Sequence, residues 1–77
     1  MSNKAVVDPQ AAADTLSRLH GLTERESDVL RLLAVGRSRA RIAQSLGVSE
    51  NTVNSHVQQI YRKLGVHGRQ ELLDRLS

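Results

Sequence analysis

The most regular hydrophobic pattern of the chain lies in its second half. Four apolar residues follow one another at intervals of four, three and four positions: Val53, Val57, Ile60 and Leu64. This spacing places them on one side of a helix. Ser49 is a typical N-cap before this stretch, and Gly65 is a typical terminator after it. The pattern predicts a helix that is capped by Ser49, runs to about Leu64 and buries one face.

Two shorter helices are predicted before this one. Thr23 and Glu26 match the capping box S/T-x-x-E, in which the two side chains accept hydrogen bonds from backbone amides at a helix start. A helix from there to about Val35 is expected. Ser38 can cap a second helix that runs to Leu46. The residues expected to face the core are Val29, Leu30, Leu33, Ile42, Ala43 and Leu46.

A helix is also predicted near each end of the chain. Asp8 and Pro9 have the form of an N-cap and a first-turn proline, which favours a helix to about His20. Its expected apolar stripe is Ala12, Leu16 and Leu19, and it could lean on the main domain, lean on a second copy, or link to an upstream domain. The stretch from Gly68 to Leu76 offers a short last helix. Its apolar positions are Leu72, Leu73 and Leu76.

No strand pattern and no internal repeat appears, so the expected fold class is all-α. The expected architecture is a four-helix domain over residues 22–77, preceded by a short N-terminal helix. Residues 1–21 are expected to comprise a flexible start, residues 1–7, followed by that short, linker-like helix. A chain of 77 residues fits one domain with a small core.

Composition narrows the functional classes. The chain has no cysteine, which excludes disulfides, thiolate metal sites and a cysteine nucleophile. No apolar run is long enough to span a bilayer, and the N-terminus lacks a signal-peptide pattern. We therefore expect a soluble, cytoplasmic protein without membrane contact, cofactor or bound small molecule in this segment.

The positive charge is unevenly distributed. Residues 1–21 hold two basic and two acidic side chains, so the whole net charge of +3 belongs to residues 22–77. Between positions 37 and 63 only Glu50 is acidic. The basic residues of that interval are Arg37, Arg39, Arg41, Arg62 and Lys63. Such a cluster is either a solvated basic face or a surface for phosphates, and its position in the fold must decide between them.

The two helices around Gly47 match a helix-turn-helix. Ala43 and Gly47 are small enough for a close approach of two helices across a tight turn. In such a motif the first helix crosses the DNA backbone, and phosphates would offset the unfavourable position of Arg39 and Arg41 in its first turn. The face of the following helix opposite its apolar side is polar and nearly uncharged. Its residues are Asn51, Ser55, Gln58 and Arg62, flanked by Asn54 and Gln59.

Amide and hydroxyl groups of this kind can recognise base edges, and asparagine or glutamine suits adenine in a bidentate contact. A merely polar, exposed face is the alternative.

Several separated motifs resemble the LuxR-type (NarL/FixJ-like) helix-turn-helix domain of bacterial transcriptional regulators. They are L-T-E-R-E at 22–26, Ile42-Ala43, Leu46-Gly47-Val48-Ser49, Thr52-Val53, His56-Val57 and I-Y-R-K-L-G-V at 60–66. The resemblance covers about three quarters of the chain. It implies a sequence-specific regulator of transcription, standing alone or as the output domain of a larger protein, that binds double-stranded DNA as a homodimer.

The resemblance also implies roles for individual residues. The helix from Ser49 to Leu64 would lie in the major groove, with base contacts from Asn54, Ser55 and Gln58. The implied phosphate contacts are Thr52, His56, Arg62 and Lys63, in addition to Arg39 and Arg41 from the preceding helix. The last helix would form the dimer contact, for which an exposed stripe of Leu72, Leu73 and Leu76 is expected.

The chain departs from the family pattern at three positions. Relatives often have lysine at Asn54, glutamate at Arg41 and a serine cap at Gly68. These departures put the target sequence and the backbone contacts in doubt, and Gly68 is a less favourable cap.

Other functional classes fit less well. Region 4 of a sigma factor, acting beside RNA polymerase, resembles the same capped helix and helix-turn-helix. A protein-interaction module that has lost DNA binding is a further alternative. His20, His56 and His67 lack the spacing of a metal motif, and no arrangement of a nucleophile, base and acid suggests an enzyme. Tyr61 is the only aromatic residue, which disfavours recognition of single strands by stacking.

Overall fold

The computed structural model describes residues 8–76, and within this range the chain forms helices and no strand. The elements are α1 (Pro9–His20), α2 (Glu24–Ala34), α3 (Arg39–Leu46), α4 (Glu50–Leu64) and α5 (Arg69–Leu76). The all-α fold class and the five predicted helices are thereby confirmed. The expectation for residues 1–7 lies outside the described part. None of the helices in that part has the length and apolarity needed to cross a membrane.

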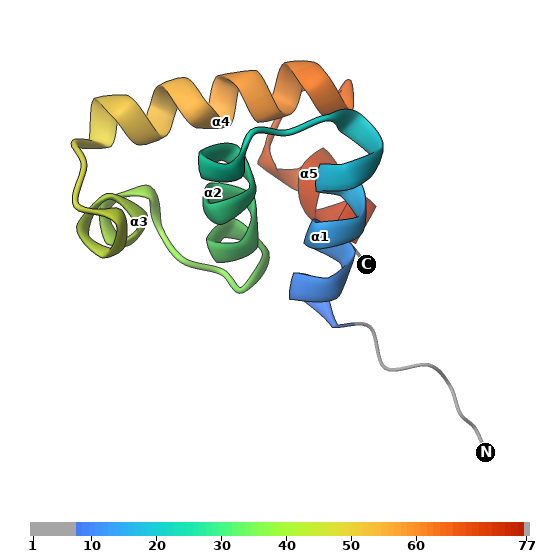
Figure 1. Cartoon of the computed structure of the whole chain (residues 1–77), viewed down its shortest axis with the longest axis horizontal. Coiled ribbons are helices and arrows are strands. Elements are labelled where there is room, and N and C mark those ends of the chain that lie inside the picture. The colour runs from blue at the N-terminus through green and yellow to red at the C-terminus, as the bar shows by residue number, and fades with distance from the viewer. Residues whose placement is uncertain (1–7, 77) are drawn as a thin grey trace.

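The longest helix, α4, lies across the ends of the others (Figure 1). Its N-terminal half packs on α3, and it also packs on α2 and α1. Helix α5 returns beneath the C-terminal end of α4 and packs beside α1. The arrangement leaves one long side of α4 without a covering helix.

Local hydrogen bonds explain where the central helices begin. The Thr23 hydroxyl accepts from the Glu26 amide at 3.1 Å, and the Glu26 carboxylate accepts from the Thr23 amide at 3.0 Å. The predicted capping box is therefore confirmed. Ser38 and Ser49 cap α3 and α4 by accepting from amides three residues ahead, at 3.2 Å and 3.1 Å.

The turn between α3 and α4 needs a glycine. Gly47 has a φ of 69°, in the left-handed region that costs little without a side chain. The next amide, that of Val48, donates to the carbonyl of Ala43 at 3.0 Å and closes the end of α3. Only residues 47–49 separate the two helices. The helix-turn-helix predicted from Ala43 and Gly47 is thus formed.

The predicted apolar faces of α2 and α4 form the centre of the core. The buried residues there are Val29, Leu30, Leu33, Val53, Val57, Ile60 and Leu64. From α3, Ile42 and Ala43 join them, while Leu46 is only partly buried at the edge. The polar outer face of α4 lies on the side of the helix opposite these buried residues. Because the buried side is packed in the core, α4 holds the polar groups in fixed positions.

The predicted stripe on α1 is wrong in one respect. Leu19 is 72% exposed, whereas Ala13 and Ser17 are the buried residues. Two small side chains allow α1 to approach α2 closely, and the Ser17 hydroxyl donates to the Ala13 carbonyl at 2.8 Å, which satisfies it. Asp14 adds an ion pair to Arg31 of α2 at 3.2 Å. Helix α1 therefore packs on α2 of its own chain.

The predicted exposed stripe on α5 is also wrong. Leu72 has no exposed surface and Leu76 is 5% exposed, because both point into the core of the same chain. Leu73 is partly buried against that core. An apolar stripe covered by its own domain has the same sequence pattern as one covered by a second copy, so the pattern alone could not separate the two.

Gly68 lacks a capping side chain, and Glu71 in the first turn of α5 bonds instead to His67, the residue before that glycine. Its carboxylate accepts a hydrogen bond from the His67 amide at 2.5 Å and lies 3.2 Å from the His67 ring. The hydrogen bond from the His67 backbone, aided by its side chain, outweighs desolvation and lowers the pKa of Glu71. At the other end of α5, Arg75 donates to the Leu64 carbonyl at 3.0 Å.

The packing of α1 is open to a direct test. Replacing Ala13 by leucine should lower the free energy of unfolding by about 1–3 kcal/mol, because three further carbon atoms would have to enter a filled interface. The matched control is Ala11→Leu, since Ala11 is exposed on the same helix. Chemical denaturation followed by circular dichroism measures both. Equal stability of the two variants would mean that α1 is not docked on α2 in solution.

Candidate nucleic-acid interface

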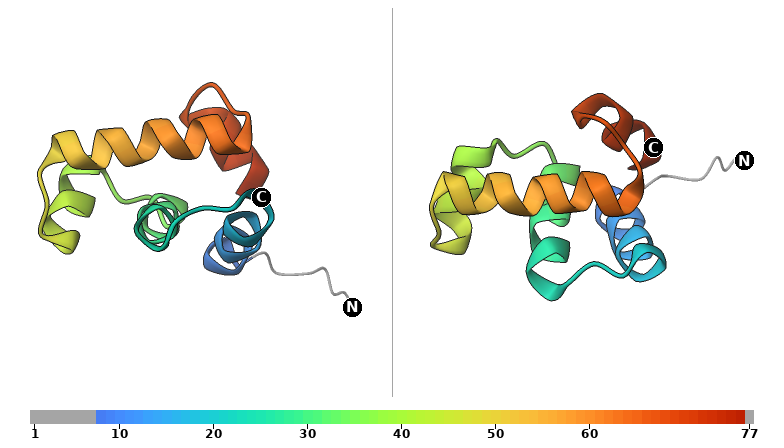
Figure 2. Two further views of the ribbon diagram at one scale, coloured as in Figure 1. Left: turned by 45° about the horizontal axis from the view of Figure 1, so that its top comes forward. Right: turned by 90° about the horizontal axis from the view of Figure 1, so that it is seen from above.

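The outer face of α4 is uncovered and polar. The residues predicted to lie opposite its apolar side are all exposed: Asn51, Ser55, Gln58 and Arg62. Seen from above, α4 lies over the other helices and none of them covers it (Figure 2). The face carries amide, hydroxyl and guanidinium groups at helical spacing and is long enough to enter a groove of duplex DNA.

The residues beside this face are partly buried. Asn54, His56 and Gln59 have intermediate exposure, as does Thr52. The Thr52 hydroxyl lies 3.1 Å from the Ser49 hydroxyl, so it belongs to the capping network at the start of α4. This anchoring fixes the N-terminal turn of α4, which directly precedes the predicted base contacts Asn54, Ser55 and Gln58.

Some charged side chains in the described part of the chain are held in ion pairs, and others are left free on the helix-turn-helix. Asp14 and Asp28 lie in ion pairs with Arg31, and Glu26 lies in one with Lys63. By contrast, the exposed Arg37, Arg41 and Arg62 have no carboxylate within 4.0 Å among residues 8–76. Three guanidinium groups on and before the helix-turn-helix thus remain available to anions.

Arg39 is joined to α4 across the turn. Its Nη1 donates to the Asn54 Oδ1 at 2.8 Å, and both residues are partly buried. The sequence assigned Arg39 to phosphate and Asn54 to a base, and it gave no indication that the two side chains meet. They are 15 positions apart, and only the helix-turn-helix geometry brings them together.

Lys63 also has a partner that the sequence did not indicate. Its ammonium lies 2.7 Å from the Glu26 carboxylate and 3.4 Å from the Gly21 carbonyl. The Lys63 side chain is 30% exposed and that of Glu26 is 7% exposed. Lys63 therefore ties the C-terminal end of α4 to the capping box of α2.

The electrostatics of Glu26 follow from this contact. Burial raises the pKa of Glu26, but the hydrogen bond and charge of Lys63 and the bonds from Thr23 outweigh it. The net result is a pKa below the ordinary value of 4.5, so the carboxylate is ionised at neutral pH.

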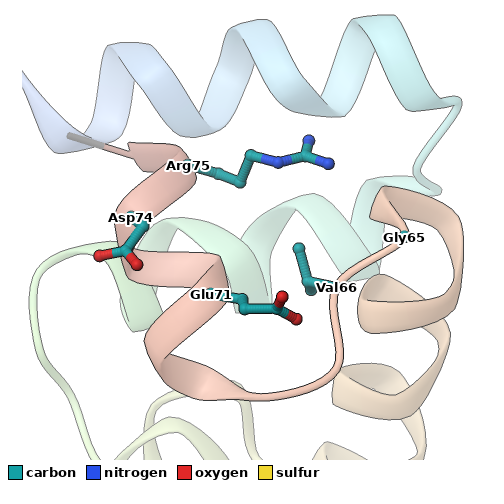
Figure 3. A pocket seen from close by; sticks show the side chains of 5 residues that line it. All are labelled: Gly65, Val66, Glu71, Asp74 and Arg75. Carbon is teal, nitrogen blue, oxygen red and sulfur yellow. The ribbon is translucent and has the colours of Figure 1, made fainter.

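A shallow hollow beside α5 does not offer a comparable site. It is lined by Gly65, Val66, Glu71, Asp74 and Arg75 (Figure 3). The carboxylates of Glu71 and Asp74 point in different directions. Within residues 8–76 no group of three or more histidine or acidic side chains is arranged to hold a metal ion. The helix-turn-helix is thus the surface with the more coherent chemistry.

Comparisons with known proteins identify the family of this helix-turn-helix. The profile of "Bacterial regulatory proteins, luxR family" matches residues 20–76. The chain is 36% identical over 75 residues to the transcriptional regulatory protein DesR of Bacillus subtilis, covering 97% of this chain and 38% of DesR. It is 49% identical over 51 residues to a nitrate/nitrite response regulator protein homolog of Haemophilus influenzae, covering 66% of this chain and 24% of that protein.

A third relative is the HTH-type transcriptional regulator MalT of Yersinia pestis, which is 41% identical over 69 residues, covering 90% of this chain and 7% of MalT. The chain thus spans less than two fifths of these relatives. No solved structure matches it closely enough to count as a relative. The family match confirms the resemblance noted in the motifs. The chain belongs to the luxR family of bacterial regulatory proteins, and its helix-turn-helix is of the kind that binds DNA in the regulation of transcription.

Proposed function

We propose that this chain binds double-stranded DNA sequence-specifically and inserts α4 into the major groove. The observation that carries the proposal is the uncovered face of α4, whose exposed amide and hydroxyl groups stand opposite a fully buried apolar ridge. A helix held in this way presents its polar side chains in a fixed orientation, which specific base contacts require.

The side chains divide into two proposed roles. Asn54, Ser55 and Gln58 contact base edges in the groove. Phosphates are contacted from both sides of the motif by Arg41, Thr52, His56 and Arg62. We leave Lys63 out of this group because its ammonium is held by Glu26. Arg39 is treated separately below.

Two copies are proposed to bind a two-fold symmetric site, as is usual for helix-turn-helix regulators. Leu72 and Leu76 are buried in their own chain and are not available for that contact. A contact through α5 would instead use its exposed polar residues, which are Arg69, Gln70, Glu71, Asp74 and Arg75.

Selection of bound duplexes from a random pool tests the proposal. We expect a motif to be enriched, with two half-sites in inverted orientation. Failure to enrich any motif would overturn sequence-specific binding. Binding only in the presence of RNA polymerase would favour a promoter-binding module of the sigma-factor kind instead.

The division of roles gives a second measurable prediction. Gln58→Ala should change base preference at one position, by about 1–3 kcal/mol of discrimination, because a base-edge contact is lost. Arg62→Ala should weaken all duplexes similarly and reduce the salt dependence of binding by about one charge. Titrations of matched and mismatched duplexes over a range of salt concentrations measure both effects. The division is wrong if the two variants lose affinity for every sequence in the same proportion.

A further inference from the structure

The hydrogen bond between Arg39 and Asn54 fixes the orientation of the asparagine side chain. A guanidinium has only donors, so the amide atom that faces it at 2.8 Å must be the carbonyl oxygen. Because the carboxamide is planar, holding the oxygen toward Arg39 also fixes the direction of the amino group. The oxygen of Asn54 therefore faces Arg39, and the two N–H donors of the side chain are the groups left for another partner.

This orientation changes what Asn54 can recognise. A bidentate contact with adenine needs the amide oxygen to accept from the adenine amino group while the amide nitrogen donates to N7. In this chain the oxygen already accepts a charge-assisted hydrogen bond from Arg39, which uses one of its two lone pairs and holds the carboxamide in one orientation. Guanine, by contrast, presents two acceptors, N7 and O6, in the major groove.

We infer that Arg39 is a specificity-determining positioning residue, which holds Asn54 as a donor so that the pair selects guanine over adenine. The inference rests on the proposed function, since it needs α4 in the major groove. Arg39 acts here through Asn54, and this role differs from the phosphate contact that the position of Arg39 in the first turn of α3 suggested. The partly buried position of both side chains favours a fixed geometry over an alternating one.

The experiment is a selection from a random duplex pool with the full chain and four variants. Asn54→Ala identifies the base position that faces Asn54, as the position whose preference is lost. At that position we expect guanine for the unmodified chain. Arg39→Ala should move the preference toward adenine by about fivefold or more, because the carboxamide can then rotate and place its oxygen opposite the adenine amino group. Arg39→Lys should keep the preference for guanine that Arg39→Ala loses, since an ammonium can also donate to Asn54.

Arg41→Ala is the matched control. It removes the same charge from the same helix, and the side chain of Arg41 is exposed and makes no hydrogen bond to Asn54. It should weaken binding to all duplexes without changing the preferred base. Circular dichroism and thermal melting establish that each variant is folded before selection.

The outcomes separate this inference from the proposed function. If the unmodified chain enriches no motif, the proposed function fails and the inference falls with it. If a motif is enriched but the position facing Asn54 prefers adenine, only the inference is overturned. The same holds if Arg39→Ala and Arg41→Ala leave the base preference equally unchanged.

Discussion

Replacing Leu72 by alanine is expected to lower the free energy of unfolding by about 2–5 kcal/mol. Leu72 has no exposed surface in its own chain, so the shorter side chain would leave a cavity in the core. A domain of this size has about 5–15 kcal/mol of stability in total, so the variant should melt at a much lower temperature. Urea denaturation and thermal melting followed by circular dichroism measure the loss.

The control for Leu72 lies on α1. Leu19→Ala removes the same atoms from a side chain that is 72% exposed, and its effect should stay within about 0.5 kcal/mol. The opposite result is also informative. If Leu72→Ala kept full stability but lost a dimer seen in sedimentation, Leu72 would be a surface contact between copies after all.

The ion pair between Glu26 and Lys63 is expected to have the next largest effect on stability. Glu26→Gln should cost about 1–3 kcal/mol at neutral pH, because the acceptor of the Lys63 hydrogen bond loses its negative charge in a largely buried position. Glutamine can still accept the capping-box hydrogen bond from the Thr23 amide, so the variant removes the charge that faces Lys63 and keeps the cap of α2.

The effect of Glu26 should depend on pH with a definite sign. Its pKa is lowered in the folded chain, so the ionised carboxylate contributes its full stabilisation above the ordinary value of 4.5. The contribution is lost as the pH falls through the lowered pKa. The stability difference between the unmodified chain and Glu26→Gln should therefore shrink in acid. A difference that stays constant from neutral to strongly acidic pH would contradict an ionised Glu26.

Lys63→Met extends this test to the other partner. It keeps most of the aliphatic stem but removes the ammonium from Glu26, so the melting temperature should fall. A phosphate role for Lys63 predicts something else, namely an unchanged melting temperature with a weaker salt dependence of DNA binding. Measuring both properties on this one variant distinguishes the two roles.

Much of the fold could be predicted because helix ends are set by neighbours in sequence. The Thr23 and Glu26 capping box and the Ser49 cap join residues three positions apart, so the amino-acid order alone defines them. The buried ridge of α4 follows in the same way from the helical period of its apolar residues, and with it the exposed polar face.

On the two terminal helices, α1 and α5, the tertiary structure alone decided which apolar residues are buried and what covers them. On α1 the approach of α2 selects Ala13 and leaves Leu19 in solvent, and on α5 the core of the same chain covers Leu72. A pattern of apolar residues defines a stripe but not its partner. That partner depends on how distant segments pack.

The features of the functional surface divide in the same way, into those set by local spacing and those set by the packing of distant segments. The sequence by itself determined that α4 is the second helix of a helix-turn-helix and carries an amide-rich outer face, since both depend on local spacing. Only the tertiary structure decided that Arg39 engages Asn54 and that Lys63 engages Glu26, across 15 and 37 positions. Contacts over such separations arise from the packing of whole helices, so no local pattern of residues encodes them.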